Sequence, residues 1–179
     1  MNKRTLQRIR VPLGFIFAAV FFVFAEPTAA TLITGGVMAI IGLLIRAWAS
    51  GHIRKAKQLA TSGPYAYTRN PLYIGSFIIG LGFTVAAGVW WLALIFSALY
   101  IGIYLPVMRV ERDDVRSIFG DEYDEYQNNV PMLIPRLTPW RKSIERFDFR
   151  LYLQYREYRA ALGTAAALAV LAAKAVFFR

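Results

Sequence analysis

Long apolar runs alternate with short polar segments along most of this chain. Five of the runs approach the length of about 20 residues at which an apolar helix crosses a bilayer. They lie at about residues 11–25, 31–50, 71–87, 89–107 and 160–178. Only a short turn at Gly88 separates the third run from the fourth, so we expect these two helices to form a hairpin. The pattern predicts an all-α integral membrane protein with about five transmembrane helices in a single domain, residues 1–179.

Residues 108–159 are polar and interrupt this series of apolar runs. The fourth helix is expected to continue beyond the membrane to about Ile118. Gly120 is a typical helix C-cap and Asp121 a typical N-cap, so a second helix should begin there. Residues 130–135 contain two prolines and are predicted to be extended.

A further helix is predicted after Thr138 and Pro139, which suit an N-cap and a first helical position. Apolar side chains then recur at helical spacing. They are Trp140, Ile144, Phe147, Leu151, Tyr155 and Tyr158. Such a stripe either lies in the headgroup plane of an anionic leaflet or packs against the rest of the protein, and the sequence leaves both possibilities open.

The composition excludes several classes of site. Hydrophobic residues make up 57% of the chain and charged residues 18%, which is far from a typical soluble protein. The chain has no cysteine, so disulfides, thiolate zinc sites and a cysteine nucleophile are excluded. Its single histidine argues against a histidine-built metal centre, and we predict no metal site.

The formal net charge of +10 is distributed as in a membrane protein and does not suggest nucleic acid as a partner. With five spans, the N-terminus, the connector after the second span and residues 108–159 share one side. Of the 21 Lys and Arg residues, only Lys174 and Arg179 fall on the other side. The asymmetry predicts a cytoplasmic N-terminus and a cytoplasmic segment 108–159, in the inner membrane if the protein is bacterial.

Opposite charges flank the predicted hairpin at this cytoplasmic end. Residues 46–69 hold five basic and no acidic residues, whereas residues 109–128 hold three basic and seven acidic ones. We expect the two segments to approach each other, although screening weakens exposed pairs.

Both segments resemble known motifs. Residues 62–75 contain Gly63-Pro64-Tyr65, then Arg69-Asn70-Pro71-Leu72-Tyr73 and Gly75. The second segment contains Glu111, Phe119-Gly120, Tyr123, Tyr126, Val130-Pro131 and Ile134-Pro135. These sets resemble the GPY…RHPxYxG and E…FG..Y..Y…VP..IP motifs of the isoprenylcysteine carboxyl methyltransferases and the related bacterial phospholipid methyltransferases. Arg46-Ala47-Trp48-Ala49 is similar to their RxWA segment, and the resemblance covers about residues 40–136.

The resemblance implies a membrane methyltransferase that uses S-adenosylmethionine, with a lipophilic acceptor that arrives laterally between helices. It assigns Arg69 and Glu111 to the polar pair beside the reacting groups. The residues expected to bind the cofactor are Tyr65, Asn70, Pro71, Leu72, Tyr73, Gly75, Tyr123 and Tyr126. Arg46 and Trp48 are predicted to contact the substrate, with interfacial anchoring of Arg46 by snorkelling as the alternative.

Two positions depart from the family pattern. Asn70 stands where the family usually has histidine, and Arg112 stands where many relatives carry a second acidic residue. Both departures favour an acceptor that needs no deprotonation, such as the carboxylate of an isoprenyl-type substrate. The alternatives are an NADPH-dependent membrane reductase of the sterol-reductase type, whose chains are typically about twice as long, and a non-enzymatic membrane assembly or scaffold protein.

Overall fold

The structure is a computed structural model that describes residues 3–54, 58–141 and 145–177. All regular elements within these residues are helices, which confirms the predicted all-α class. In chain order they are α1 (Lys3–Phe24), α2 (Ala29–Ser50), the 3-10 helix η1 (Gly63–Ala66), α3 (Pro71–Ala86), α4 (Trp90–Asn129), α5 (Phe149–Gln154) and α6 (Tyr158–Phe177).

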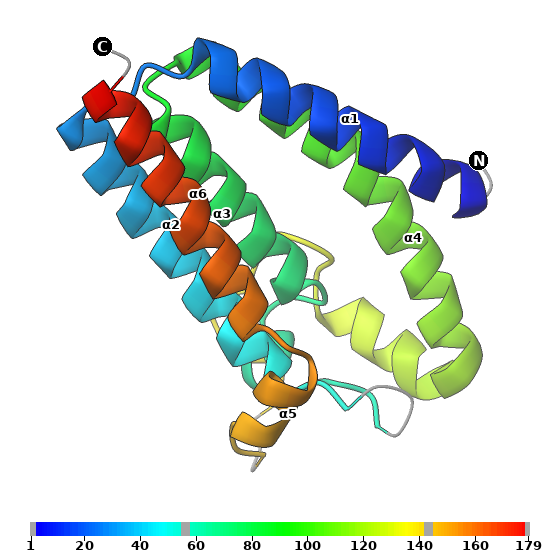
Figure 1. Cartoon of the computed structure of the whole chain (residues 1–179). Coiled ribbons are helices and arrows are strands. Elements are labelled where there is room, and N and C mark those ends of the chain that lie inside the picture. The colour runs from blue at the N-terminus through cyan, green and yellow to red at the C-terminus, as the bar shows by residue number, and fades with distance from the viewer. Residues whose placement is uncertain (1–2, 55–57, 142–144, 178–179) are drawn as a thin grey trace.

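The long helices form two groups (Figure 1). Helices α2, α3 and α6 lie side by side, and α2 and α3 make the most extensive contact between elements. Helix α1 runs along the first half of α4, which diverges from α3 towards its far end. The predicted hairpin of α3 and α4 is therefore present, but it is open at the end opposite its turn.

Glycines allow the close approach of α2 and α3. A Cβ atom added to Gly42 would lie 2.6 Å from the carbonyl oxygen of Gly75, and one added to Gly82 would lie 2.6 Å from the carbonyl oxygen of Gly35. The two backbones thus touch without intervening side chains. This is the packing by which small residues hold helices together inside a bilayer, where the hydrophobic effect does not favour association.

Helices α2, α4 and α6 are long and apolar enough to cross a bilayer, judged by length and composition within the described residues. Residues 12–24 of α1 and the whole of α3 are apolar but shorter. The predicted spans agree closely with these helices, whereas α1 begins at Lys3, well before the expected start at residue 11, and carries Pro12 inside it. The number of spans and their orientation stay predictions.

Helix α4 continues beyond its apolar part and then folds back. A straight helix of 40 residues would be about 60 Å long, roughly twice the hydrocarbon thickness of a bilayer. Gly120 interrupts it with φ 50° and ψ −125°, a conformation open to glycine and strained for other residues. This confirms the predicted break at Gly120, and the final part of α4 turns back towards α3 (Figure 1).

The chain after α4 leaves the helix at Val130, whose backbone is extended, and then bends at residues 132–134, so the predicted extended conformation does not hold throughout residues 130–135. It pairs with the segment that precedes α3. The N–H of Arg69 donates to the carbonyl of Pro131 at 3.0 Å, and that of Arg136 donates to Tyr67 at 2.9 Å. The Thr68 hydroxyl contacts the carbonyl of Met132 at 3.2 Å. These bonds hold the two sequence motifs against each other.

The prediction of a long helix after Pro139 is wrong. Between residues 136 and 157 the described chain is helical only in the six residues of α5; Ile144 lies outside the described residues. The backbone groups are used elsewhere, because the N–H of Trp140 donates to Ala66 and that of Asp148 donates to Gly51, both at 3.0 Å. Long-range backbone bonds replace the intrahelical ones that the apolar spacing suggested.

Candidate active site

A cavity of about 370 Å³ lies between the first turn of α3 and the second half of α4. Its wall combines Ile53 and residues 58–60 of the connector with residues that lie within 65–73 and 108–132. The predicted site residues that line it are Tyr65, Arg69, Asn70, Pro71, Leu72, Tyr73, Glu111, Tyr123 and Tyr126. The structure thus brings both motifs to one cavity, whose volume lies in the range of small-molecule sites.

Arg69 is fixed by its surroundings and keeps a spare donor. Its backbone N–H bonds to Pro131, and its Nη1 donates to the hydroxyl of Tyr123 at 3.2 Å. Its Nε is buried and has no hydrogen-bond partner among the described residues. A guanidinium is always charged and carries five N–H donors, so this side chain offers the cavity a positive charge and an unused donor.

Tyr65 supplies a second unused donor. The residue is 5% exposed, and its hydroxyl has no hydrogen-bond partner in the described part of the chain. Burial, followed by the negative charge of Glu111, raises the pKa of Tyr65, so the hydroxyl stays protonated at neutral pH. The hydroxyl of Tyr126 donates to the Tyr65 carbonyl at 2.8 Å, and this bond helps to fix the position of Tyr65.

Glu111 lies on α4 and its carboxylate accepts a hydrogen bond of 2.9 Å from the hydroxyl of Tyr73 on α3. The pair bridges the open end of the hairpin. The next residue, Arg112, also lines the cavity, and its guanidinium bonds to the carboxylate of Asp113 at 2.7 Å. The cavity therefore has a carboxylate at one edge and the Arg69 guanidinium in its wall.

Asn70 and Gly75 have structural contacts. The Asn70 amide donates to the carbonyl of Met132 at 3.1 Å, which ties the first motif to the second. Pro71 occupies the first position of α3, as predicted. Gly75 does not line the cavity; it faces α2, where an added Cβ would lie 2.7 Å from the carbonyl oxygen of Gly42.

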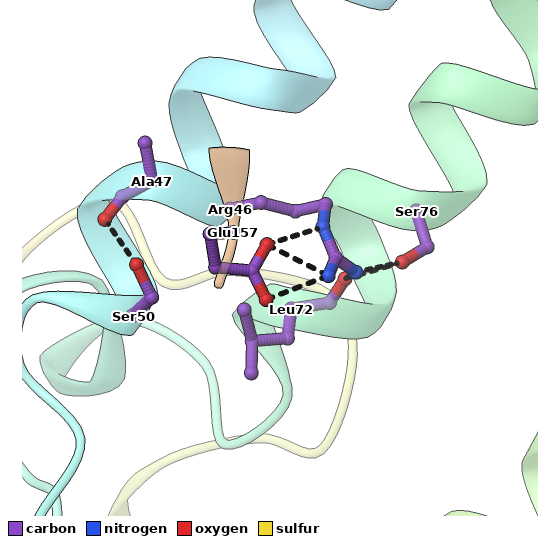
Figure 2. A network of polar contacts seen from close by, with 6 residues as sticks. All are labelled: Arg46, Ala47, Ser50, Leu72, Ser76 and Glu157. Carbon is purple, nitrogen blue, oxygen red and sulfur yellow. Dashed lines mark hydrogen bonds and ion pairs between the residues drawn. The ribbon is translucent and has the colours of Figure 1, made fainter. Parts of the chain in front are cut away.

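Arg46 and Trp48 also lie outside the cavity lining. The Arg46 side chain reaches from α2 across to α3 and is bound by the carboxylate of Glu157, which follows α5 (Figure 2). Trp48 is 45% exposed, and the centroid of its ring lies 6.3 Å from that of Tyr67. A ligand bound inside the cavity would therefore not contact Arg46 or Trp48.

Several apolar residues of the wall were not among the predicted site residues. Leu59, Met108, Val115 and Phe119 line the cavity, and Leu59 and Met108 are buried. Val115 and Phe119 lie one turn apart on α4, so their helical spacing was a usable signal. Leu59 belongs to the irregular connector, where no pattern in the sequence indicates its burial.

Comparison with known proteins identifies the family. The family model described as phospholipid methyltransferase matches residues 28–122, more than half of the chain. The chain belongs to this family. The matched region contains Arg69 and Glu111 and ends immediately before Tyr123.

Some named relatives are methyltransferases, in agreement with this assignment, and others are named as metal-resistance proteins. The chain is 28% identical to the protein-S-isoprenylcysteine O-methyltransferase of Schizosaccharomyces pombe, over 74% of this chain and 58% of that protein. It is 33% identical to the cobalt-zinc-cadmium resistance protein CzcN of Cupriavidus metallidurans, over 78% of this chain and 69% of that protein. It is 34% identical to a methanethiol S-methyltransferase of Crocosphaera subtropica, over 40% of this chain and 27% of that protein.

The chain thus spans somewhat more than half the length of the isoprenylcysteine methyltransferase that it matches. No solved structure gave a significant match. The substrates in the names of these relatives range from a lipid-modified cysteine to a small thiol.

Proposed function

We propose that this member of the phospholipid methyltransferase family transfers a methyl group from S-adenosylmethionine to a lipophilic acceptor at the cytoplasmic face of the membrane. The favoured acceptor group is the carboxylate of an isoprenyl-type substrate. One observation carries the proposal: both motifs line a single cavity, and its wall holds two buried donors, Tyr65 Oη and Arg69 Nε, without partners among the described residues.

The residues fit the cofactor that the family implies. Its amino-acid end carries a carboxylate and an ammonium group, which Arg69 and Glu111 match in charge. An unpaired buried donor costs free energy, so a ligand that accepts from Arg69 Nε and Tyr65 Oη would gain by satisfying both. The rings of Tyr123 and Tyr126, both buried, provide apolar surface for an adenine.

The bound cofactor would supply an electrophilic methyl group on a sulfonium, so the protein has mainly to position the two reactants. Asn70 cannot take a proton at neutral pH, and its amide already bonds to Met132. The Tyr65 hydroxyl stays protonated and acts as a donor. These groups suit an acceptor that is already ionised, because a carboxylate needs no general base.

The acceptor is proposed to reach the site from the bilayer. The outer faces of α2, α4 and α6 expose large apolar side chains such as Ile41, Leu94 and Leu162. The cavity lies beside the ends of these apolar runs and has Leu72 and Met108 in its wall. A substrate with an apolar tail and a charged head could therefore keep its tail among lipids while its head enters the cavity.

Ligand binding tests the proposal. The purified protein in nanodiscs is titrated with S-adenosylhomocysteine and, separately, with NADPH. We expect binding of S-adenosylhomocysteine alone. Binding of NADPH alone would replace the proposal with a reductase, and binding of neither would favour a scaffold protein.

Glu111→Gln tests the site directly. This substitution removes the negative charge while it keeps the size of the side chain, and we expect affinity for S-adenosylhomocysteine to fall about tenfold or more. Glu122→Gln is the matched control, since Glu122 is exposed on the same helix and does not line the cavity. Equal affinity in both variants would reject the role of Glu111.

A further inference from the structure

The connector between α2 and η1, residues 51–62, supplies part of the cavity wall without regular secondary structure in its described residues, 51–54 and 58–62. Leu59 is 6% exposed and packs with the buried residues Tyr123, Tyr126 and Val130. Within these residues no helical or sheet ladder holds the wall in place, so its position depends on contacts with other parts of the chain.

The carboxylate of Glu145 binds the end of the connector that leads into η1. It accepts hydrogen bonds from Nε2 of Gln58 and from the hydroxyl of Ser62, both at 2.6 Å. Gln58 lines the cavity, whereas Ser62 is 1% exposed and is the N-cap residue of η1. Hydrogen bonds to an ionised acceptor are about twice as strong as neutral ones. One carboxylate therefore joins a residue of the cavity wall to a buried residue at the start of η1.

The same stretch of chain also binds the other end of the connector. The N–H of Asp148 donates to the carbonyl of Gly51 at 3.0 Å. The ring of Phe147 packs so closely against Gly51 that a Cβ at this position would overlap the ring. The centroid of the Phe147 ring also lies 6.3 Å from that of His52, which is 7% exposed. Residues 145–148 thus tie both ends of the connector in place, and the wall residue Leu59 lies between these ends.

Leu59 belongs to the apolar part of the cavity. It lines the cavity together with Val115, Phe119, Tyr123 and Tyr126, which form or contact the same apolar cluster. A purine base is flat and has apolar faces, so it suits this part of the wall better than the charged amino-acid end of the cofactor does. The connector therefore closes the cavity where the base is expected to bind.

We propose that Glu145 is a positioning residue for the adenosine end of the cofactor. Its carboxylate holds the connector so that Leu59 closes the cavity beside the rings of Tyr123 and Tyr126, and the base binds among these three side chains. The inference rests on the proposed function and specifies which part of the cofactor this wall contacts. Glu145 lies beyond both sequence motifs and beyond residues 28–122, which the family model matches, so neither assigns it a role.

Two ligands separate the ends of the cofactor. S-adenosylhomocysteine carries both ends, whereas 5′-methylthioadenosine keeps the adenosine and lacks the charged amino-acid group. Glu145→Ala leaves two donors of the connector without their acceptor, and we expect it to lower the affinity for both ligands about tenfold in nanodiscs. Glu111→Gln is the contrast, since it should weaken S-adenosylhomocysteine alone. A loss in Glu145→Ala that is confined to S-adenosylhomocysteine would overturn the assignment to the adenosine end.

A variant with a packing defect elsewhere separates positioning from general stability. Gly35→Ala disturbs the contact of α2 with α3 at the carbonyl oxygen of Gly82, and Gly35 does not line the cavity. We expect it to lower the melting temperature while both ligand affinities stay at their wild-type values. Equal losses of affinity in Gly35→Ala and Glu145→Ala would show that lowered stability accounts for them, and would overturn the inference.

A conservative substitution should preserve binding. Glu145→Gln introduces a carboxamide that can accept from Gln58 and donate to Ser62, so we expect both affinities to stay within about threefold of wild type. Ser62→Ala removes one of the two bonds and should lower both affinities about threefold; it replaces Glu145→Ala if that variant does not fold. Glu125→Ala is the matched control, since it removes an exposed carboxylate that pairs with Arg141 and should leave both affinities unchanged.

The positioning role and the proposed methyl transfer can fail separately. If the wild-type protein binds S-adenosylhomocysteine but Glu145→Ala changes neither affinity, or Glu145→Gln loses as much as Glu145→Ala, only the positioning role is rejected. Binding of S-adenosylhomocysteine without binding of 5′-methylthioadenosine would likewise reject only the site for the adenosine end. If the wild-type protein binds neither ligand, the proposed methyl transfer is rejected together with the role of Glu145.

Discussion

The two sides of α3 are packed in opposite ways. Towards α2, glycines on both helices bring backbone against backbone. Towards α4, aromatic rings separate the helices, with Phe77 5.2 Å from Tyr100 and Tyr73 5.7 Å from Tyr104 between ring centroids. The small residues fix the position of α3, and the large ones hold α4 at a distance that leaves space for the cavity at their open end.

The largest effect is expected at the glycine contact. A Cβ on Gly35 would clash with the carbonyl oxygen of Gly82 and lie 2.5 Å from the backbone nitrogen of Ala86, and neither atom can move alone. We expect Gly35→Ala to lower the free energy of unfolding by about 1–3 kcal/mol. Gly36→Ala is the control, since its Cβ would meet only Leu168 at 3.9 Å. Thermal unfolding in detergent measures both, and equal melting temperatures would contradict the packing difference.

A smaller effect is expected on the aromatic side. A Cβ on Gly80 would meet the ring of Phe96, which is the end of a movable side chain. Displacing the ring from its rotamer costs about 0.5–1.5 kcal/mol. Alanine in place of glycine stabilises a helix by about 0.8–1.0 kcal/mol, so the two terms nearly cancel. Gly80→Ala should therefore melt close to wild type, and a loss as large as that of Gly35→Ala would show that this side is rigid too.

The smallest change in stability is expected in the cavity. Tyr65→Phe removes a buried hydroxyl that has no partner within the described structure, so the ligand-free protein should be as stable as wild type or slightly more stable. Affinity for S-adenosylhomocysteine should fall about fivefold, the equivalent of one hydrogen bond of about 1 kcal/mol. Tyr126→Phe is the contrast, because its hydroxyl bonds to Tyr65 and its loss should lower stability. Unchanged affinity in Tyr65→Phe would remove that hydroxyl from the site.

The sequence predicted the helices that depend on local patterns. Apolar runs placed α2 and α3 to within about two residues at each end, and Gly120 marked the break in α4. The sequence also predicted that the two motif segments lie close together, because a hairpin returns residues near 70 and 111 to the same end; both segments line one cavity. What each of these residues does chemically stays a prediction.

Other features depended on contacts between distant residues. The apolar spacing after Pro139 predicted a helix, but Trp140 bonds to Ala66 and packs its ring 5.6 Å from that of Tyr126. The pair of Arg46 and Glu157 joins residues 111 positions apart, and each is an ordinary charged residue in its local segment. No periodicity or motif indicates either contact, because only the assembled bundle brings these groups together.

The turn between α3 and α4 sets how far the open end can move. It is tied down by backbone bonds, since the N–H of Glu26 donates to the carbonyl of Ala87 at 2.7 Å and the Thr31 hydroxyl donates to that of Ala86 at 3.2 Å. Helix α3 extends about 24 Å from this fixed point to the cavity. Because α3 is fixed against α2, a rotation of α4 by about 5° relative to α3 at the turn would shift α4 by about 2 Å over that length. A small change at the turn, which is remote from the cavity, would therefore become a larger displacement at the open end of the hairpin, where the acceptor is proposed to enter.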